Sequence, residues 1–134
     1  MHVDLRNQLV GAPSQLPGST ALSGTTAANG SAVDCDLADG PIYGIFNTGA
    51  ATGSPTSFTV TCKLQESDTS GGTYTDLVSQ TTLVLSAGST MGIIQGIRTK
   101  RYVRTVVTPA FTGGSSPTVP TSANVVGQKR RIGT

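Results

Sequence analysis

The chain has 134 residues and a formal net charge of +2, which suits one domain with a hydrophobic core and leaves no room for two full-sized domains. Tryptophan is absent, only 12% of the residues are charged, and Gly, Ser and Thr are abundant. This composition is typical of short strands joined by many turns, and it argues against a helical bundle, which would be rich in Leu, Ala, Glu and Lys.

Charge is distributed unevenly along the chain. Residues 1–80 carry all seven acids and two bases, for a net charge of −5, whereas residues 81–134 carry seven bases and no acid. One interpretation is a basic surface for nucleic acid or for an acidic protein partner. The other is that strands of the two halves interleave, so that the charges mix on the folded surface. We favour the second interpretation because sandwiches usually shuffle their strands.

The first 31 residues are predicted to form an extended arm. Thirteen of the 21 residues from 11 to 31 are Gly, Pro, Ser or Thr, and such a segment buries too little apolar area to offset the entropy lost on ordering. We therefore expect an arm over residues 1–31, disordered in isolation, and a folded domain over residues 32–134. Five apolar side chains could anchor the arm on neighbouring subunits: Leu5, Leu9, Val10, Leu16 and Leu22.

The beginning of the chain also bears on where the protein is made. Residues 1–11, "MHVDLRNQLVG", are too few and too charged for a signal peptide, and no stretch approaches 18 consecutive apolar residues. We expect a soluble protein that is made in the cytoplasm and has no membrane partner.

From residue 32 onward the apolar residues recur with a period of two. The clearest case is the segment 57–65, in which Phe58, Val60, Cys62 and Leu64 alternate with polar residues. Turn signals separate eight such segments, which cover residues 32–37, 41–47, 57–65, 73–78, 81–86, 90–97, 101–108 and 121–128. About eight short strands at near-regular spacing predict an all-β fold, an antiparallel β-sandwich of the jelly-roll kind.

The segment Lys63–Leu77, "KLQESDTSGGTYTDL", interrupts a strand with acids, hydroxyls and two glycines. Its acids do not have the spacing of a calcium-binding EF-hand loop. A catalytic loop would need partners, and the one histidine, His2, lies at the end of the chain. We therefore predict a hairpin in which Gly71 and Gly72 adopt positive φ. No catalytic residue, metal or cofactor is expected, and the protein is not expected to be an enzyme.

Two cysteines, Cys35 and Cys62, lie on the apolar side of their predicted strands. Their number and spacing fit neither a disulfide scaffold nor a zinc site. We expect buried free thiols, and the sequence leaves open whether the two residues are close enough to form a disulfide.

Several motifs, in order, resemble a family of small structural proteins of tailed phages. They are "CKLQESDTSGGTYTDL" at 62–77, "TKRYVRTVVT" at 99–108 and "VVGQKRRI" at 125–132, preceded by "DLADGPIYGIFNTGAATG" at 36–53. The resemblance implies a virion protein of the capsid decoration (cement) type with a jelly-roll-like sandwich. Such proteins commonly sit as trimers on the outside of the shell and clamp neighbouring major capsid subunits. The family supplies no catalytic residues.

The expected function is therefore structural, with the major capsid protein and further copies of this chain, in a homotrimer, as partners on the virion exterior. Besides the apolar residues of the arm, four basic residues are candidate partner contacts: Arg98, Lys100, Arg101 and Arg104. They either pair with acids of a neighbour, such as Asp34, Asp36 and Asp39, or form a solvated strand face.

Three other functions are alternatives to this one. A head–tail or tail-tube component stays within the virion. A carbohydrate-binding sandwich for host adhesion would need aromatic platforms, for which Tyr43, Tyr74 and Tyr102 are the available tyrosines. Nucleic-acid binding through "QKRR" at 128–131 is not expected, because no aromatic residue interleaves with these charges.

Overall fold

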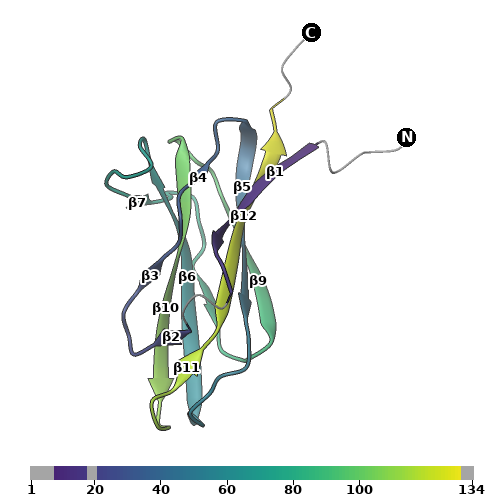
Figure 1. The fold of residues 1–134 in the computed structure, drawn as a ribbon. Coiled ribbons are helices and arrows are strands. Elements are labelled where there is room, and N and C mark those ends of the chain that lie inside the picture. Colours follow the sequence, from purple (N-terminus) through teal and green to yellow (C-terminus); the bar gives the residue numbers. More distant parts are fainter. Residues whose placement is uncertain (1–7, 18–20, 131–134) are drawn as a thin grey trace, which may run out of the picture.

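The computed structural model describes residues 8–17 and 21–130, and their regular elements are strands throughout (Figure 1). The long strands are β1 (Leu9–Gln15), β5 (Ala38–Thr48), β6 (Ser57–Ser67), β9 (Thr90–Gly96), β10 (Tyr102–Thr112) and β12 (Thr121–Lys129). The short strands are β2 (Leu22–Ser23), β3 (Ala28–Asn29), β4 (Val33–Asp34), β7 (Thr75–Asp76), β8 (Leu83–Leu85) and β11 (Thr118–Val119).

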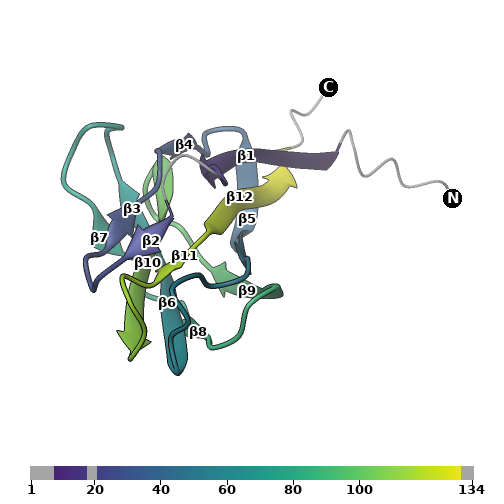
Figure 2. The ribbon, with the colours of Figure 1, turned by 60° about the horizontal axis from the view of Figure 1, so that its bottom comes forward.

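The strands form two antiparallel sheets that pack face to face, as the two layers in Figure 2 show. Sheet A has the order β1-β12-β5-β9. Sheet B has the order β3-β10-β6-β7, with β4 also on β10 and β8 also on β6, and β2 pairs separately with β11. If β3 with β4, and β7 with β8, each count as one interrupted strand, the chain order across the sheets is 1-8-3-6 and 2-7-4-5. This is the order of an eight-stranded jelly roll, so the predicted fold class is confirmed.

The core lies between the two sheets and follows the alternation that the sequence predicted. The inward side chains include Val60, Cys62 and Leu64 of β6, Val103 and Val107 of β10, Ile42 and Phe46 of β5, and Val125 of β12. Gly44 belongs to the same inward set of β5, and a Cβ there would lie 2.8 Å from side-chain carbons of both Leu64 and Phe46. The missing side chain therefore lets the sheets close on Leu64.

The described part of the expected arm is built into the sandwich of its own chain. β1 pairs with β12 from Leu9 opposite Gln128 to Gln15 opposite Ala123, with a bulge that leaves Ser14 out of the ladder. The Ser14 hydroxyl donates to the Ser31 carbonyl (2.8 Å) and accepts from the backbone N–H of Thr105 in sheet B (3.0 Å). The prediction of disorder considered only how much apolar area the side chains of this segment could bury. The segment is instead held largely by backbone hydrogen bonds, which its composition does not reveal.

The interrupted segment between β6 and β7 is a hairpin, as predicted, because Gln65 pairs with Asp76 and Glu66 with Thr75. The expected positive φ at its glycines is wrong, since neither Gly71 nor Gly72 is among the glycines with positive φ. A Cβ at Gly72 would collide with the Thr69 hydroxyl and lie 3.0 Å from the Ser67 hydroxyl, so a larger residue there would require these side chains to move.

The two cysteines are free thiols in the core, and they lie far apart. The backbone N–H of Cys35 donates (2.9 Å) to the carbonyl of Arg101, which directly precedes β10, whereas Cys62 pairs with Val107 within β10. Six residues of strand separate these points, or about 20 Å, and a disulfide requires Cα atoms within about 7 Å. Burial raises the pKa of Cys35 to about 11 and that of Cys62 to about 12.

We expect both thiols to be unreactive toward a thiol reagent at pH 8 in the native protein, because each is buried and protonated. Unfolding in guanidinium without a reductant should release two titratable thiols. A titration of native and unfolded protein checks both statements. Fewer than two thiols after unfolding would contradict the separation of Cys35 and Cys62.

Candidate interaction surfaces

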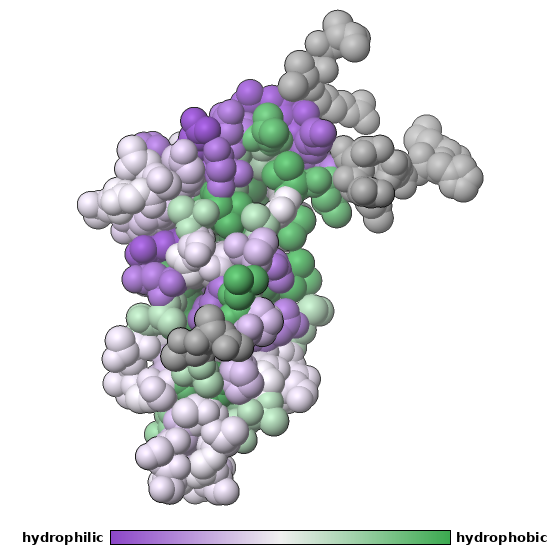
Figure 3. Space-filling view, viewed as in Figure 1, coloured by the Kyte–Doolittle hydropathy of each residue, from purple (hydrophilic) through white to green (hydrophobic). Residues whose placement is uncertain are grey.

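The described charged residues gather toward one end of the sandwich. This charged end consists of the segments 34–39, 66–68, 98–101 and 129–130, and the remaining charges (Lys63, Asp76 and Arg104) lie on the outer face of sheet B. The opposite end, formed by the loops 49–56, 86–89 and 113–117, has no charged residue. In Figure 3 purple surface accordingly gathers at one end and the other end is pale. Acids of the first half thus lie beside bases of the second half, which supports the interpretation that the charges mix.

Arg101, one of the expected partner contacts, is paired within the chain. Its Nε and Nη2 donate to the two carboxylate oxygens of Asp34, at 2.9 and 2.7 Å. The pairing of β4 with β10 brings the two residues together, because Asp34 lies opposite Tyr102. The hydrogen bonds from Arg101, and then the one from the backbone N–H of Asp36, lower the pKa of Asp34 to about 2. Arg101 thus takes neither predicted arrangement, pairing with an acid of a neighbour or a purely solvated face, because Asp34 of its own chain binds it.

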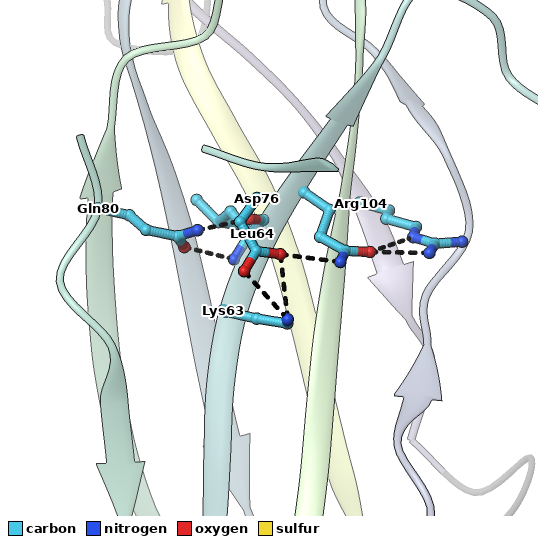
Figure 4. A network of polar contacts seen from close by, with 6 residues as sticks. Lys63, Leu64, Asp76, Gln80 and Arg104 are labelled. Atoms are coloured by element: carbon cyan, nitrogen blue, oxygen red, sulfur yellow. Dashed lines mark hydrogen bonds and ion pairs between the residues drawn. The ribbon is translucent and has the colours of Figure 1, made fainter. Parts of the chain in front are cut away.

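Arg104 belongs to a network on the outer face of sheet B (Figure 4). Its Nε and Nη2 donate to the Gln65 side-chain oxygen, at 3.1 and 2.8 Å, and its guanidinium lies 4.1 Å from the centroid of the Tyr74 ring. The Gln65 amide in turn donates to Asp76 (2.9 Å), which also forms an ion pair with Lys63 (3.0 Å). These two contacts, Gln65 first, lower the pKa of Asp76. The network connects β10, β6 and β7, and within it the guanidinium of Arg104 is bound by Gln65 and stacked on Tyr74.

Next to this network a side chain takes the place of a strand. The amide of Gln80 accepts from the backbone N–H of Leu64 and donates to its carbonyl, each at 2.7 Å (Figure 4). Leu64 lies between the part of β6 that pairs with β7 and the part that pairs with β8. The Gln80 side chain thus continues the ladder across the gap between these short edge strands.

Glu66 is a buried carboxylate whose role the sequence analysis missed. It is 3% exposed and accepts from the Thr99 backbone N–H (2.7 Å), the Thr99 hydroxyl (2.7 Å) and the Lys100 backbone N–H (3.2 Å). Three donors hold the turn that carries Arg98, Lys100 and Arg101. A signal was present, because Glu66 continues the inward alternation of Val60, Cys62 and Leu64.

Arg98 lies in a cleft at the charged end. Its guanidinium donates to the carbonyls of Ala38 (2.7 Å) and Lys100 (3.1 Å). The cleft measures about 500 Å³ and is lined by Ala38, Asp39, Gly40, Pro41, Gln95, Ile97, Arg98, Thr99 and Arg130. Within the described residues, no ion pair is formed by four cations of the charged end: Arg98, Lys100, Lys129 and Arg130. In the described part of the charged end these four cations are therefore the ones without a carboxylate partner, and two backbone carbonyls already bind the guanidinium of Arg98.

The apolar residues expected to anchor the arm differ in how exposed their side chains are. Leu9 and Leu16 are 48% and 61% exposed, and Val10 is half-buried. Leu22 is a core residue, only 6% exposed, so its side chain has little surface to offer a partner. Leu5 lies outside the described residues. Two further apolar side chains that were not predicted as contacts, Leu37 and Ile97, are 49% and 58% exposed at the charged end.

The described residues contain no cluster of three or more His, Cys, Asp or Glu side chains placed to hold a metal ion. None of them forms a helix that is long and apolar enough to span a membrane.

We predict that Glu66→Gln lowers the free energy of unfolding by about 1–3 kcal/mol. The NH2 group of the glutamine would replace one carboxylate oxygen and would point at the N–H or O–H groups that this oxygen now accepts from. Asp68→Asn, at an exposed position of the same hairpin, is the control and should change stability by less than about 0.5 kcal/mol. Urea unfolding of the three proteins tests this. Equal midpoints for Glu66→Gln and wild type would show that the three hydrogen bonds do not hold the turn.

The ion pair between Asp34 and Arg101 is expected to make the stability of the fold depend on pH. Because the pKa of Asp34 is lowered to about 2, its ion pair stabilises the folded state above the ordinary pKa of 3.8 and ceases to do so as the pH falls toward 2. The pair is exposed and screened by solvent, so its contribution is small. The difference in unfolding free energy between wild type and Asp34→Asn should shrink between pH 5 and pH 2, with Asp36→Asn as control. A difference that stays constant down to pH 2 would contradict this.

No protein-family model and no curated protein matches the chain. Among solved structures, the crystal structure of the PBSX exported protein XepA is similar, with a TM-score of 0.57 and 16% sequence identity. The similarity covers 93% of this chain and 39% of that chain, so this chain spans about two fifths of the length of the protein it matches. At this level of identity the likeness is one of fold: two antiparallel sheets packed as a sandwich.

Proposed function

We propose that the protein is a structural component of a phage virion, which binds the major capsid protein on the outside of the shell and stabilises the contacts between capsid subunits. The observation that carries this proposal is that the sequence motifs and the fold both resemble those of phage-related proteins. The motifs at 62–77, 99–108 and 125–132 resemble those of phage structural proteins, and the fold resembles that of a protein of PBSX, a phage-like element.

The charged end is the surface we assign to the shell. Of the described cations there that lack an ion pair, Arg98 and Arg130 line the same cleft as exposed Ile97. Lys100 and Lys129 lie close to them in the chain. Acidic side chains on the shell would find charge partners, and apolar groups would cover Ile97. Modest contacts suffice for this role, because many copies act on one shell.

Host adhesion through carbohydrate is less well supported by the aromatic residues. Tyr74 has the guanidinium of Arg104 over its ring at 4.1 Å, and Tyr102 has that of Arg101 at 5.3 Å. A sugar stacks on a free aromatic face, and these two rings are already covered on one side. Tyr43 is 37% exposed on the outer face of sheet A.

The test is co-sedimentation of the purified protein with shells that lack it. We expect saturable binding of wild type and a loss of at least tenfold in affinity for Arg130→Glu, whose charge reversal places an acid beside the cleft. Ser115→Glu, which adds an acid at the uncharged end, should bind as wild type does. Absence of binding by the wild type would refute the function, whereas equal binding by all three would refute only the assignment of the surface.

A further inference from the structure

The four edges of the two sheets are protected to different degrees. The edges of sheet B consist of β3 with β4 and of β7 with β8, strands of two or three residues. The edge strand β1 of sheet A contains Pro13 and a bulge at Ser14. Short strands, prolines and bulges are the devices that prevent an edge from pairing with another chain. Three of the four edges therefore have such protection.

The fourth edge, β9, has none of these devices. Its seven residues, "TMGIIQG", contain no charged residue and no proline. Its register against β5 runs without a shift from Thr90 opposite Thr48 to Gly96 opposite Ile42. A long, regular, uncharged edge is the kind that pairs with another strand.

The hydrogen-bonding groups on this edge can be identified. The N–H of Gly49 donates to the carbonyl of Pro120, so the odd-numbered residues of β5 bond toward β12 and the even-numbered ones toward β9. In β9 the even-numbered residues, from Thr90 to Gly96, then bond to β5. The backbone groups of Met91, Ile93 and Gln95 point to the free edge, and within the described residues they have no strand to pair with.

The side chains of the same residues lie on the outer face of sheet A and are also uncovered. Met91 is 61% exposed and Ile93 is 54% exposed. The strands beside them continue an uncharged surface, which comprises Tyr43, Ile45 and Asn47 of β5 and Ser122, Asn124 and Val126 of β12. A strand added at β9 would therefore meet unpaired backbone groups and apolar side chains together.

We propose that a second copy of this chain occupies the edge, with β9 pairing antiparallel to β9 of the other copy about a two-fold axis at Ile93. A strand is self-complementary in this arrangement: Ile93 lies opposite its own counterpart, and Met91 lies opposite the counterpart of Gln95. Because residues 90–97 and the adjacent outward residues Tyr43, Ile45 and Asn47 of β5 are uncharged, the paired strands bring no like charges together. The joined sheet has eight strands and ends at β1 on both sides, where Pro13 and the bulge prevent further addition. The assembly thus closes as a dimer.

This inference does not depend on the proposed virion function. It also differs from the homotrimer that the sequence resemblance implies, so mass in solution separates the two. Light scattering over a range of concentrations should give about 27 kDa, twice the chain mass of 13.6 kDa. A stable monomer or a trimer would overturn the proposal.

Two variants locate the contact on β9. Ile93→Lys places two positive charges opposite each other at the axis, and Gln95→Pro removes an edge N–H that bonds nothing within the described chain. Both variants should be monomeric. Their melting temperatures should be close to that of wild-type protein measured at a concentration low enough for the dimer to dissociate. Val84→Lys, which replaces a side chain that is 52% exposed on sheet B, should remain dimeric.

Hydrogen exchange gives a second readout that is independent of folding defects. In the dimer the amides of Met91, Ile93 and Gln95 should exchange at least tenfold more slowly than in the Ile93→Lys monomer. A dimer that survives Ile93→Lys, or one in which these three amides exchange at the monomer rate, would overturn the proposal, because the copies would then meet elsewhere.

Discussion

The pairing of β10 with β6 is the constraint on which the rest of the structure depends. Eleven consecutive residue pairs join the two strands, from Tyr102 opposite Ser67 to Thr112 opposite Ser57, without a bulge. This ladder fixes which residues face the core, and the short strands β3, β4, β7 and β8 all attach to one of its two members. A slip of one residue would turn Val103, Val107 and Leu64 to solvent, so the register is strongly specified.

The two faces of this ladder have different tasks. Its inner face contributes core residues and one carboxylate, Glu66, which is tolerable in the interior because three donors satisfy it. Its outer face carries the chain of contacts from Lys63 through Asp76 and Gln65 to Arg104. Among the residues that the structure describes, no such network lies on the outer side of sheet A, and that contrast distinguishes the two surfaces as possible sites of association.

Apart from the two-residue β11, which no predicted segment covers, the strands after residue 32 were predictable because a half-buried strand leaves a period of two in the sequence. All eight predicted segments contain strands. The paired state of Arg101 was not predictable, because only the pairing of β4 with β10 places Asp34 beside it. The strands β1, β2 and β3 were missed for a different reason. Their positions depend on hydrogen bonds to partners about 75 to 120 residues away, and neither composition nor local periodicity records such partners.

The place of β12 in sheet A has a consequence for how the protein is made. β12 lies between β1 and β5, so β1 has no strand to pair with until residues 121–129 have been synthesised. The sandwich therefore closes only after residues 121–129 have left the ribosome, and β1 waits longer for its partner than any other strand does. A waiting strand rich in Leu, Ile and Val would invite aggregation. The Gly, Pro, Ser and Thr content that resembled disorder in the sequence is the composition that keeps an unpaired segment soluble until its partner arrives.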